Sequence, residues 1–128
     1  MENEGIATRD FIYVEDIVDG LLKCAAAGKA GDVYNLAGGA ETSILELART
    51  INEMTGSQVP VEIGPRRDWD HSGRRFGSTE KAKTVLGFQA ARGLREGLSA
   101  TITWTGDNLA LIDACIAKHA ARMKELRS

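Results

Sequence analysis

The chain has 128 residues and a mass of 13.8 kDa, which is room for one ordinary domain, since domains usually hold roughly 100–200 residues. Apolar residues make up 43% and charged residues 27% of the chain, close to globular averages, which excludes a disordered or collagen-like chain. The formal net charge is −2, which argues against a general nucleic-acid or anionic-membrane binder.

The N-terminal part of the chain predicts a strand, a helix and a second strand. Residues 11–14 are aromatic and β-branched, which favours a short strand. Between Asp16 and Gly28 apolar residues recur at helical spacing, and these are Ile17, Val18, Leu21, Leu22 and Ala25. Residues 32–37 predict the second strand, which a Gly-Gly pair ends. The short links between these elements favour a parallel crossover unit.

A second helix has a clear predicted start. Ser43 is followed three residues later by Glu46, which is the spacing of a capping box. The apolar face of this helix is formed by Ile44, Leu47, Ala48 and Ile51, and Gly56 ends it. Residues 59–63 predict a further strand, and we expect it at a sheet edge because Pro60 has no N–H to donate.

The last part of the chain predicts helices. Ser78 or Thr79 caps a short helix that ends at Gly87. The next helix carries an apolar stripe formed by Leu94, Leu98 and Ile102. Gly106 predicts a kink or a break, with Asp107 as the cap of a new helix. Beyond it, apolar spacings of three and four fit an amphipathic helix on its own domain or a coiled-coil seam, formed by Leu109, Ile112, Ile116, His119, Met123 and Leu126.

The cysteines and the start of the chain indicate the compartment. Cys24 and Cys115 form no Cys-x-x-Cys motif, and we expect both to be buried and reduced. His71 and His119 are far apart in sequence and give no metal signature. No apolar run approaches the ~20 residues of a membrane span, and the acidic start of the chain is unlike a signal peptide. We therefore expect a soluble, cytoplasmic protein.

Arginines gather in one loop of this acidic protein. Between residues 66 and 75 the charged residues are Arg66, Arg67, Asp68, Asp70, Arg74 and Arg75. A guanidinium is always charged, and its planar fork matches phosphate oxygens. Arg67 and Asp70, together with Arg9 before the first predicted strand, are therefore candidates for a diphosphate site. The alternative is a solvated turn whose exposed ion pairs contribute under ~1 kcal/mol each.

Several motifs in a fixed order resemble a known family. Residues 8–18 read Thr-Arg-Asp-Phe-Ile-Tyr-Val-Glu-Asp-Ile-Val, and residues 31–39 read Gly-Asp-Val-Tyr-Asn-Leu-Ala-Gly-Gly. A Ser-Ile-x-Glu-Leu helix start, the Arg-x-x-Asp loop and three further segments follow, at residues 43–47, 67–70, 78–82, 86–88 and 94–104. Together they resemble the C-terminal half of extended short-chain dehydrogenases/reductases, the NAD-dependent nucleotide-sugar epimerases and dehydratases. The resemblance covers about three-quarters of the chain.

This resemblance implies a fold and a site. The fold is a helix-rich α/β fragment, with the last parallel strands of a Rossmann-like sheet, a small α/β substrate-binding subdomain and C-terminal helices. Residues 1–104 form the epimerase-like part and residues 105–128 a helical tail. In the family the two matching arginines contact the diphosphate of the nucleotide sugar, and the loop aspartate fixes a nearby sugar or arginine. The resemblance implies these roles in the substrate site for Arg9, Arg67 and Asp70. Arg66 is the alternative to Arg67.

The sequence lacks two parts of the family's machinery. It has no glycine-rich turn of the kind whose N–H groups hold a dinucleotide pyrophosphate. The family's catalytic tyrosine is followed four residues later by a lysine, whereas Ile17 follows Tyr13 and Gly38 follows Tyr34 at that spacing. We therefore expect no catalytic, cofactor-binding or metal-binding residue in this chain. NAD belongs to the intact family, and the chain alone is expected to be inactive.

Two classes of function remain open. The first is the substrate-binding portion of an epimerase/dehydratase-like protein, with weak affinity for a nucleotide sugar. The second is an interaction module: a homo-oligomer that associates through apolar faces and strand edges normally covered by the rest of the enzyme, or a subunit that completes another half-enzyme. No nucleic-acid or membrane partner is expected.

Overall fold

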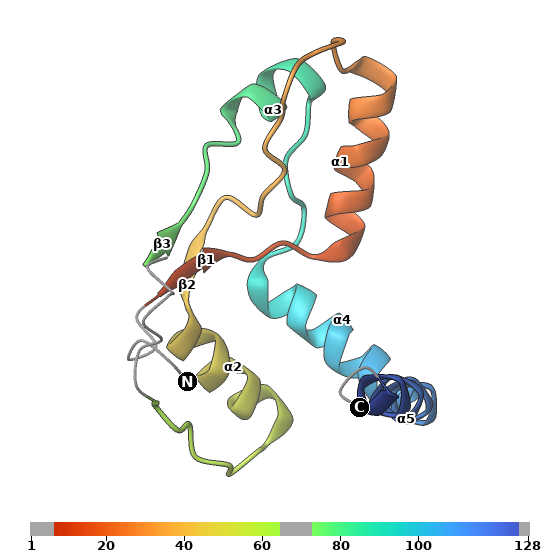
Figure 1. The fold of residues 1–128 in the computed structure, drawn as a ribbon. Coiled ribbons are helices and arrows are strands. Elements are labelled where there is room, and N and C mark those ends of the chain that lie inside the picture. The colour runs from red at the N-terminus through yellow and green to blue at the C-terminus, as the bar shows by residue number, and fades with distance from the viewer. Residues whose placement is uncertain (1–6, 65–72, 126–128) are drawn as a thin grey trace. The chain divides into compact units, whose positions relative to one another are not determined.

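The structure, a computed structural model, describes residues 7–64 and 73–125 (Figure 1). The helices are α1 (Val14–Ala27), α2 (Ile44–Thr55), α3 (Glu80–Leu86), α4 (Leu94–Asp107) and α5 (Leu109–Glu125). The strands are β1 (Thr8–Asp10), β2 (Glu41–Ser43) and β3 (Arg74–Arg75). The predicted helix-rich α/β class is confirmed. The chain divides into two compact units, Met1–Leu98 and Ser99–Ser128, and the predicted division at residue 104 stays a prediction.

A small mixed sheet organises the first unit. Its strand order is β2-β1-β3, with β2 antiparallel and β3 parallel to the central strand. Figure 1 shows the three strands side by side, although they come from distant parts of the chain. The Thr8 N–H donates to the Gly73 carbonyl at 3.0 Å, so the first residue of β1 also fixes the residue just before β3.

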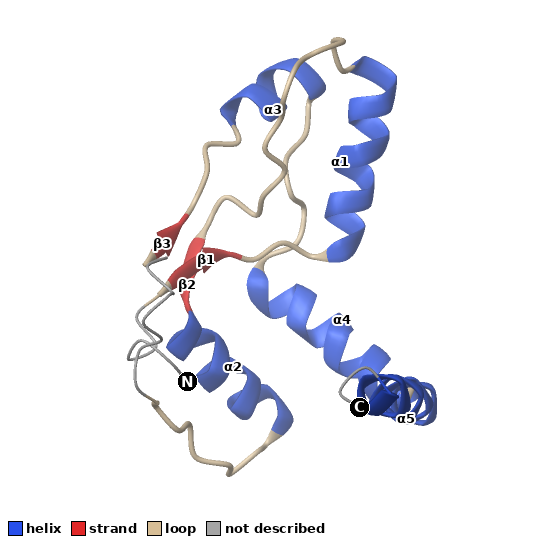
Figure 2. Cartoon of the chain, viewed as in Figure 1, coloured by secondary structure: helices blue, strands red, loops and turns tan. Residues whose placement is uncertain are grey.

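Three predicted strands are wrong. The strand predicted at 11–14 lies three residues earlier, because β2 and β3 offer partners only to residues 8–10. Residues 32–37 and 59–63 run as loops (Figure 2). No described strand lies beside either segment, so no ladder of backbone hydrogen bonds forms there. The predicted parallel crossover from residues 11–14 to 32–37 is therefore also wrong for the described part of the chain.

The helix ends follow the sequence signals closely. The Ser43 Oγ accepts a hydrogen bond from the Glu46 N–H at 3.0 Å, which confirms the predicted cap of α2. Gly56 after α2 and Gly87 after α3 adopt left-handed backbone conformations, with φ of 66° and 62°. This conformation ends a helix at little cost only when the residue is glycine.

The core of the first unit lies between α1 and α3. Its buried residues are Ala82, Leu86 and Phe88, with Ile12, Cys24, Tyr34, Leu36 and Val85 packed around them. Helix α1 approaches this core through Gly20, where a Cβ atom would lie 2.8 Å from Leu36 Cδ1. Of the predicted apolar residues of α1, Ile17 is half-buried, whereas Val18, Leu21 and Leu22 are 49%, 57% and 65% exposed.

The second unit contains the break that the sequence predicts near Gly106. The break falls at Asn108, whose backbone carbonyl accepts from the Ile112 N–H at 3.0 Å and whose side-chain amide donates to the Trp104 carbonyl at 2.8 Å. Asp107 is therefore the last residue of α4 and not the predicted cap of α5. The Asn108 side chain thus satisfies a carbonyl at the C-terminal end of α4, whereas a helix tolerates one internal glycine for about 1 kcal/mol.

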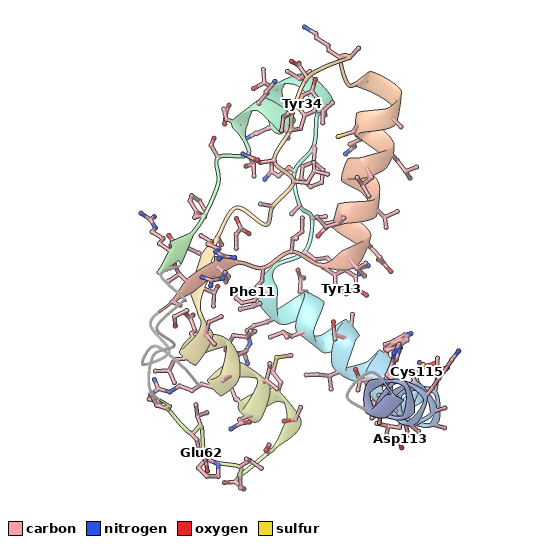
Figure 3. All side chains as sticks on the ribbon, in the orientation of Figure 1. Phe11, Tyr13, Tyr34, Glu62, Asp113 and Cys115 are labelled. Carbon is pink, nitrogen blue, oxygen red and sulfur yellow. The ribbon has the colours of Figure 1, made fainter. Side chains whose placement is uncertain are left out.

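The cysteines are free, and Cys24 is half-buried. Cys115 on α5 is exposed, so its predicted burial is wrong (Figure 3). None of the helices in residues 7–64 and 73–125 has the length and apolarity that crossing a bilayer requires.

Candidate functional site

The side chains of the small sheet divide between its two faces. Register-paired residues of neighbouring strands share a face, and successive residues alternate. One face therefore carries Thr8, Asp10, Glu41, Ser43 and Arg74, and the other carries Arg9, Thr42 and Arg75. The sequence-predicted ligand Arg9 thus lies on the opposite face from every carboxylate of these three strands.

An ion pair occupies the first face. The Arg74 Nε donates to both carboxylate oxygens of Glu41, at 2.6 and 2.8 Å, and the Thr8 hydroxyl donates to the same carboxylate. These hydrogen bonds, Arg74 first, lower the pKa of Glu41, and Glu41 in turn raises the pKa of Arg74. Arg74 is therefore held by β2 across the sheet.

Asp10 at the end of β1 holds the glycine turn of residues 38–39. Its two carboxylate oxygens accept from the Gly38 N–H at 2.7 Å and the Gly39 N–H at 2.9 Å. A Cβ atom at Gly38 would lie 2.5 Å from the Phe11 carbonyl oxygen. The turn therefore packs directly on the chain that leaves β1, which orders the backbone next to Arg9.

Arg9 extends from β1 toward the start of β3. Its Nη1 donates to the Thr8 carbonyl at 2.7 Å and to the Gly73 carbonyl at 3.4 Å. Gly73 belongs to the arginine-rich segment of residues 66–75, and it is the residue of that segment whose carbonyl lies beside Thr8 and Arg9. The other predicted ligands, Arg67 and Asp70, and the alternative Arg66 lie outside the described residues.

Sequence reasoning did not predict that Arg75 lies beside Arg9 on the sheet. Arg75 belongs to the arginine run of residues 66–75, and in the sequence it is more than sixty residues away from Arg9. The structure pairs the two in register on adjacent parallel strands. The charge run was the available signal, and only the strand pairing identifies which of its arginines faces Arg9.

An apolar cavity of about 200 Å³ lies in the same unit. It is lined by Phe11, Ile12, Tyr13, Leu47, Ile51, Arg92, Gly93, Leu94, Gly97 and Leu98. Figure 3 shows Phe11 and Tyr13 on the link between β1 and α1. The Arg92 guanidinium stacks 4.6 Å from the Tyr13 ring centre and pairs with Glu15 at 2.7 Å. Among these lining residues the cation, Arg92, therefore already has partners, and the rest of the lining is largely apolar.

The described part of the chain offers no group of three or more His, Cys, Asp or Glu side chains placed to hold a metal ion. Arg9 and Arg75 contribute guanidinium groups to the sheet of this unit, and groups of this kind bind and orient anions.

Comparisons with known proteins agree with the resemblance seen in the sequence. The model of the NAD dependent epimerase/dehydratase family matches residues 1–37. UDP-glucose 4-epimerase 3 of Oryza sativa subsp. japonica is 36% identical over 110 residues, which are 82% of this chain and 29% of that protein. The Bordetella bronchiseptica enzyme WbmF, solved with NAD+ and UDP, is 49% identical over 96% of this chain and 36% of its own, with a TM-score of 0.81. UDP-glucose 4-epimerase of Thermotoga maritima, solved with UDP-glucose, is 28% identical over 85% of this chain and 35% of its own, with a TM-score of 0.80.

Fold and sequence together define a part of an extended short-chain dehydrogenase/reductase. More particularly, the chain belongs to the NAD-dependent epimerase/dehydratase family, and it spans about a third of the length of the relatives it matches. The structural similarity to WbmF covers 96% of the chain and therefore includes most of α5. The similarity therefore extends beyond Trp104, where the sequence motifs end.

The described residues do not fit the dinucleotide that the family name implies. A dinucleotide pyrophosphate needs a glycine-rich turn between a strand and a helix N-terminus. The link between β1 and α1 is Phe11, Ile12 and Tyr13, with no glycine. Among the described glycines with positive φ, Gly56 and Gly87 follow helix C-termini.

Proposed function

We propose that this chain is the nucleotide-sugar-binding portion of an epimerase/dehydratase-like protein, with no catalysis of its own. In this proposal Arg9 and Arg67 hold the diphosphate, Asp70 fixes a nearby sugar or arginine, and the sugar nucleotide binds weakly. The binding energy that such arginines supply serves to orient the substrate in the complete fold.

One observation carries this proposal. The Arg9 guanidinium donates to the Gly73 carbonyl, and Gly73 follows Arg67 and Asp70 closely in the sequence. Arg9 and the arginine-rich segment, which lie far apart in sequence, are therefore connected at Gly73. The relatives solved with UDP and with UDP-glucose support the choice of ligand class.

Titration calorimetry with UDP-glucose tests the site. Arg9→Ala and Arg67→Ala are each expected to weaken binding at least tenfold, because each removes charge-assisted hydrogen bonds to phosphate. Arg95→Ala is the matched control, since Arg95 pairs with Glu53 at 2.7 Å on other elements of the chain. Binding that neither Arg9→Ala nor Arg67→Ala changes would disprove the assignment.

The absence of catalysis has its own assay. The purified chain, supplied with NAD, is expected not to interconvert UDP-glucose and UDP-galactose, and not to retain dinucleotide through gel filtration. Tyr13 and Tyr34 lack the lysine partner that the resemblance implies for the proton transfer. Any turnover by the chain alone would contradict this part of the proposal. If that turnover survived Tyr13→Phe and Tyr34→Phe, a group other than these tyrosines would transfer the proton.

A second candidate function, self-association, is favoured by α5. This helix exposes large apolar residues, with Leu109, Leu111 and Ile116 each more than half exposed. They adjoin an apolar hollow of about 500 Å³ lined by Trp104, Leu111, Ile112, Cys115, Ile116, His119 and Ala120. Apolar surface of this kind on a small unit favours a partner.

The charges of α5 favour a second copy as that partner, in antiparallel orientation. Asp113 lies in the first half of the helix, and Lys118 lies in the second half. Antiparallel pairing places the acidic half of each helix beside the basic half of the other, and it also aligns the helix dipoles favourably.

Light scattering over micromolar concentrations tests this second function. The chain is expected to form a dimer that Ile116→Asp dissociates. Leu22→Asp is the control, because Leu22 is an equally exposed leucine on α1. A monomer at all concentrations, or dissociation by Leu22→Asp in place of Ile116→Asp, would exclude α5 as the interface.

A further inference from the structure

Two metal-ligating side chains lie on one face of α5. Cys115 and His119 are four residues apart in this helix, so they occupy successive turns of the same face, with Cβ atoms about 5–6 Å apart. Both residues are exposed, and both line the apolar hollow beside Trp104. The sequence predicted a buried Cys115 and no metal ligand, but the exposed position of Cys115 makes its thiol accessible to a metal ion.

This pair supplies half of a zinc site. Structural zinc sites are built from cysteine thiolates and histidine imidazoles, almost always four of them in a tetrahedron. Cys115 and His119 provide one ligand of each kind, and in the described part of the chain no group of three or more His, Cys, Asp or Glu side chains is placed to hold a metal ion. The site is therefore incomplete without a second copy of the chain.

The position of the pair along α5 suits the antiparallel pairing proposed above. Helix α5 spans Leu109–Glu125, so Ala117 is its middle residue, and Cys115 and His119 lie two residues before and after it. In a centred antiparallel pair, Cys115 of each copy is therefore level with His119 of the other. The four side chains then lie within about 6 Å along the axis, at about 1.5 Å per residue. Two cysteines and two histidines are a common ligand set for structural zinc.

The surroundings of the pair are apolar. Leu111, Ile112 and Ile116 line the same hollow as the two ligands. Apolar side chains around a metal limit the access of water to it. They also supply the contact between two copies, but apolar contacts alone leave the register of two helices loosely defined, whereas a single polar position fixes it. A metal ion bound at the level of Ala117 would fix the register of the α5 pair.

We propose that Cys115 and His119 of two copies of this chain bind one zinc ion between paired α5 helices. The inference deepens the second candidate function, self-association through α5, and rests on it. Each Cys115 thiol releases its proton to solvent when the sulfur binds the metal, so zinc affinity falls in acid. The zinc ion holds the two copies together and takes no part in binding a nucleotide sugar.

Titration of the full chain with zinc chloride, in competition with a chromophoric chelator and with a phosphine reductant present, tests the proposal. One zinc ion per two chains is expected. Cys115→Ser and His119→Ala are each expected to weaken zinc binding at least about 100-fold, because each removes two of the four ligands of the pair. Cys24→Ser is the matched control, since Cys24 is half-buried on α1, and this variant is expected to bind zinc like the unchanged chain.

Light scattering with zinc and with a chelator separates this inference from self-association. If the chain dimerises equally in both conditions and takes up no zinc, the zinc site is wrong and the pairing of α5 stands. If the chain is a monomer in both conditions, self-association and this inference fail together. One zinc ion per chain, or zinc binding that neither Cys115→Ser nor His119→Ala weakens, would also overturn the ligand set. Circular dichroism checks the fold of each variant, and Cys115→Ala and His119→Gln replace any variant that does not fold, under the same criteria.

Discussion

The carboxylate of Asp16 accepts a hydrogen bond from the backbone N–H of Ala91, seventy-five residues further along the chain, at 3.1 Å. Its other oxygen accepts from the Arg92 N–H at 3.2 Å. Asp16 is buried in the first turn of α1, so this side chain ties the start of that helix to the segment before α4. A buried carboxylate with two backbone donors satisfies the rule that buried charges carry partners.

Replacing Asp16 tests the strength of this link. Asp16→Ala is expected to lower the free energy of unfolding by about 2–4 kcal/mol, because two charge-assisted hydrogen bonds are lost and two N–H groups lose their acceptor. Asp19→Ala is the control on the same helix, where an exposed pair with Lys23 contributes at most about 0.5 kcal/mol. Urea unfolding followed by circular dichroism measures both. Equal effects of the two substitutions would contradict the role of Asp16.

Gly38 offers a second test, of the turn that packs on β1. A Cβ atom there would meet the Phe11 carbonyl oxygen at 2.5 Å and an oxygen of Asp10 at 2.9 Å. Gly38→Ala is therefore expected to destabilise the chain by about 1–3 kcal/mol, as overpacking does. Gly106→Ala in α4 meets no atom within 4 Å, and alanine is expected to stabilise that helix by about 0.5–1 kcal/mol. A stabilising Gly38→Ala, measured by the same urea unfolding, would refute the close packing.

The sequence predicted the helices better than the strands, and the reason is physical. Helix signals are local, so Ser43 with Glu46 and the glycines at 56 and 87 identify helix ends without knowledge of the rest of the fold. A strand needs a partner that the local sequence does not specify. Val33 has strand propensity, but it is 78% exposed and no described strand pairs with its segment.

Only part of the candidate site could be predicted, because local motifs are visible in the sequence and strand pairing is not. Arg9 could be selected because its charge precedes an apolar segment in a family-like motif. Arg9 and Arg75 are neighbours only because β1 and β3 pair in parallel. These strands lie more than sixty residues apart in sequence, and no periodicity in the sequence reveals their pairing. Likewise the binding of Arg74 to Glu41 follows from the antiparallel pairing of β2 with β1.

The ion pair between Glu41 and Arg74 predicts a dependence of stability on pH. The pKa of Glu41 in the folded chain lies below its ordinary value of 4.5, chiefly because Arg74 donates to it. The folded state therefore binds this proton less readily than the unfolded state. The contribution of Glu41 is then fully present above about pH 4.5 and is lost as the pH falls through the folded-state pKa.

Urea unfolding at several pH values checks this contribution. The stability difference between the unchanged chain and Glu41→Gln is expected to be constant near neutrality and to disappear in acid. In the double variant Glu41→Gln with Arg74→Gln, the second substitution is expected to add little, because the pair is already broken. A difference that grows as the pH falls would contradict the sign of the pKa shift.

Chemical crosslinking tests the antiparallel pairing of α5. Cys115 lies in the apolar hollow and is exposed, whereas Cys24 is half-buried on α1. Cys115 is two residues from the middle of α5, so in a centred antiparallel pair the two sulfur-bearing residues lie about 6 Å apart along the axis, at 1.5 Å per residue. A short bismaleimide is expected to link two copies of Cys24→Ser through Cys115, and to leave Cys115→Ser as single chains.

The orientation requires a second labelling position. In a chain with Cys24→Ser and Cys115→Ser, Asn108→Cys places the thiol nine residues before the helix middle. Two such thiols lie roughly 27 Å apart along the axis of an antiparallel pair, beyond a short linker, but side by side in a parallel pair. Linkage through residue 108 would therefore establish a parallel dimer and disprove the charge argument from Asp113 and Lys118. Absence of linkage through Cys115 at concentrations where light scattering reports a dimer would place the interface outside α5.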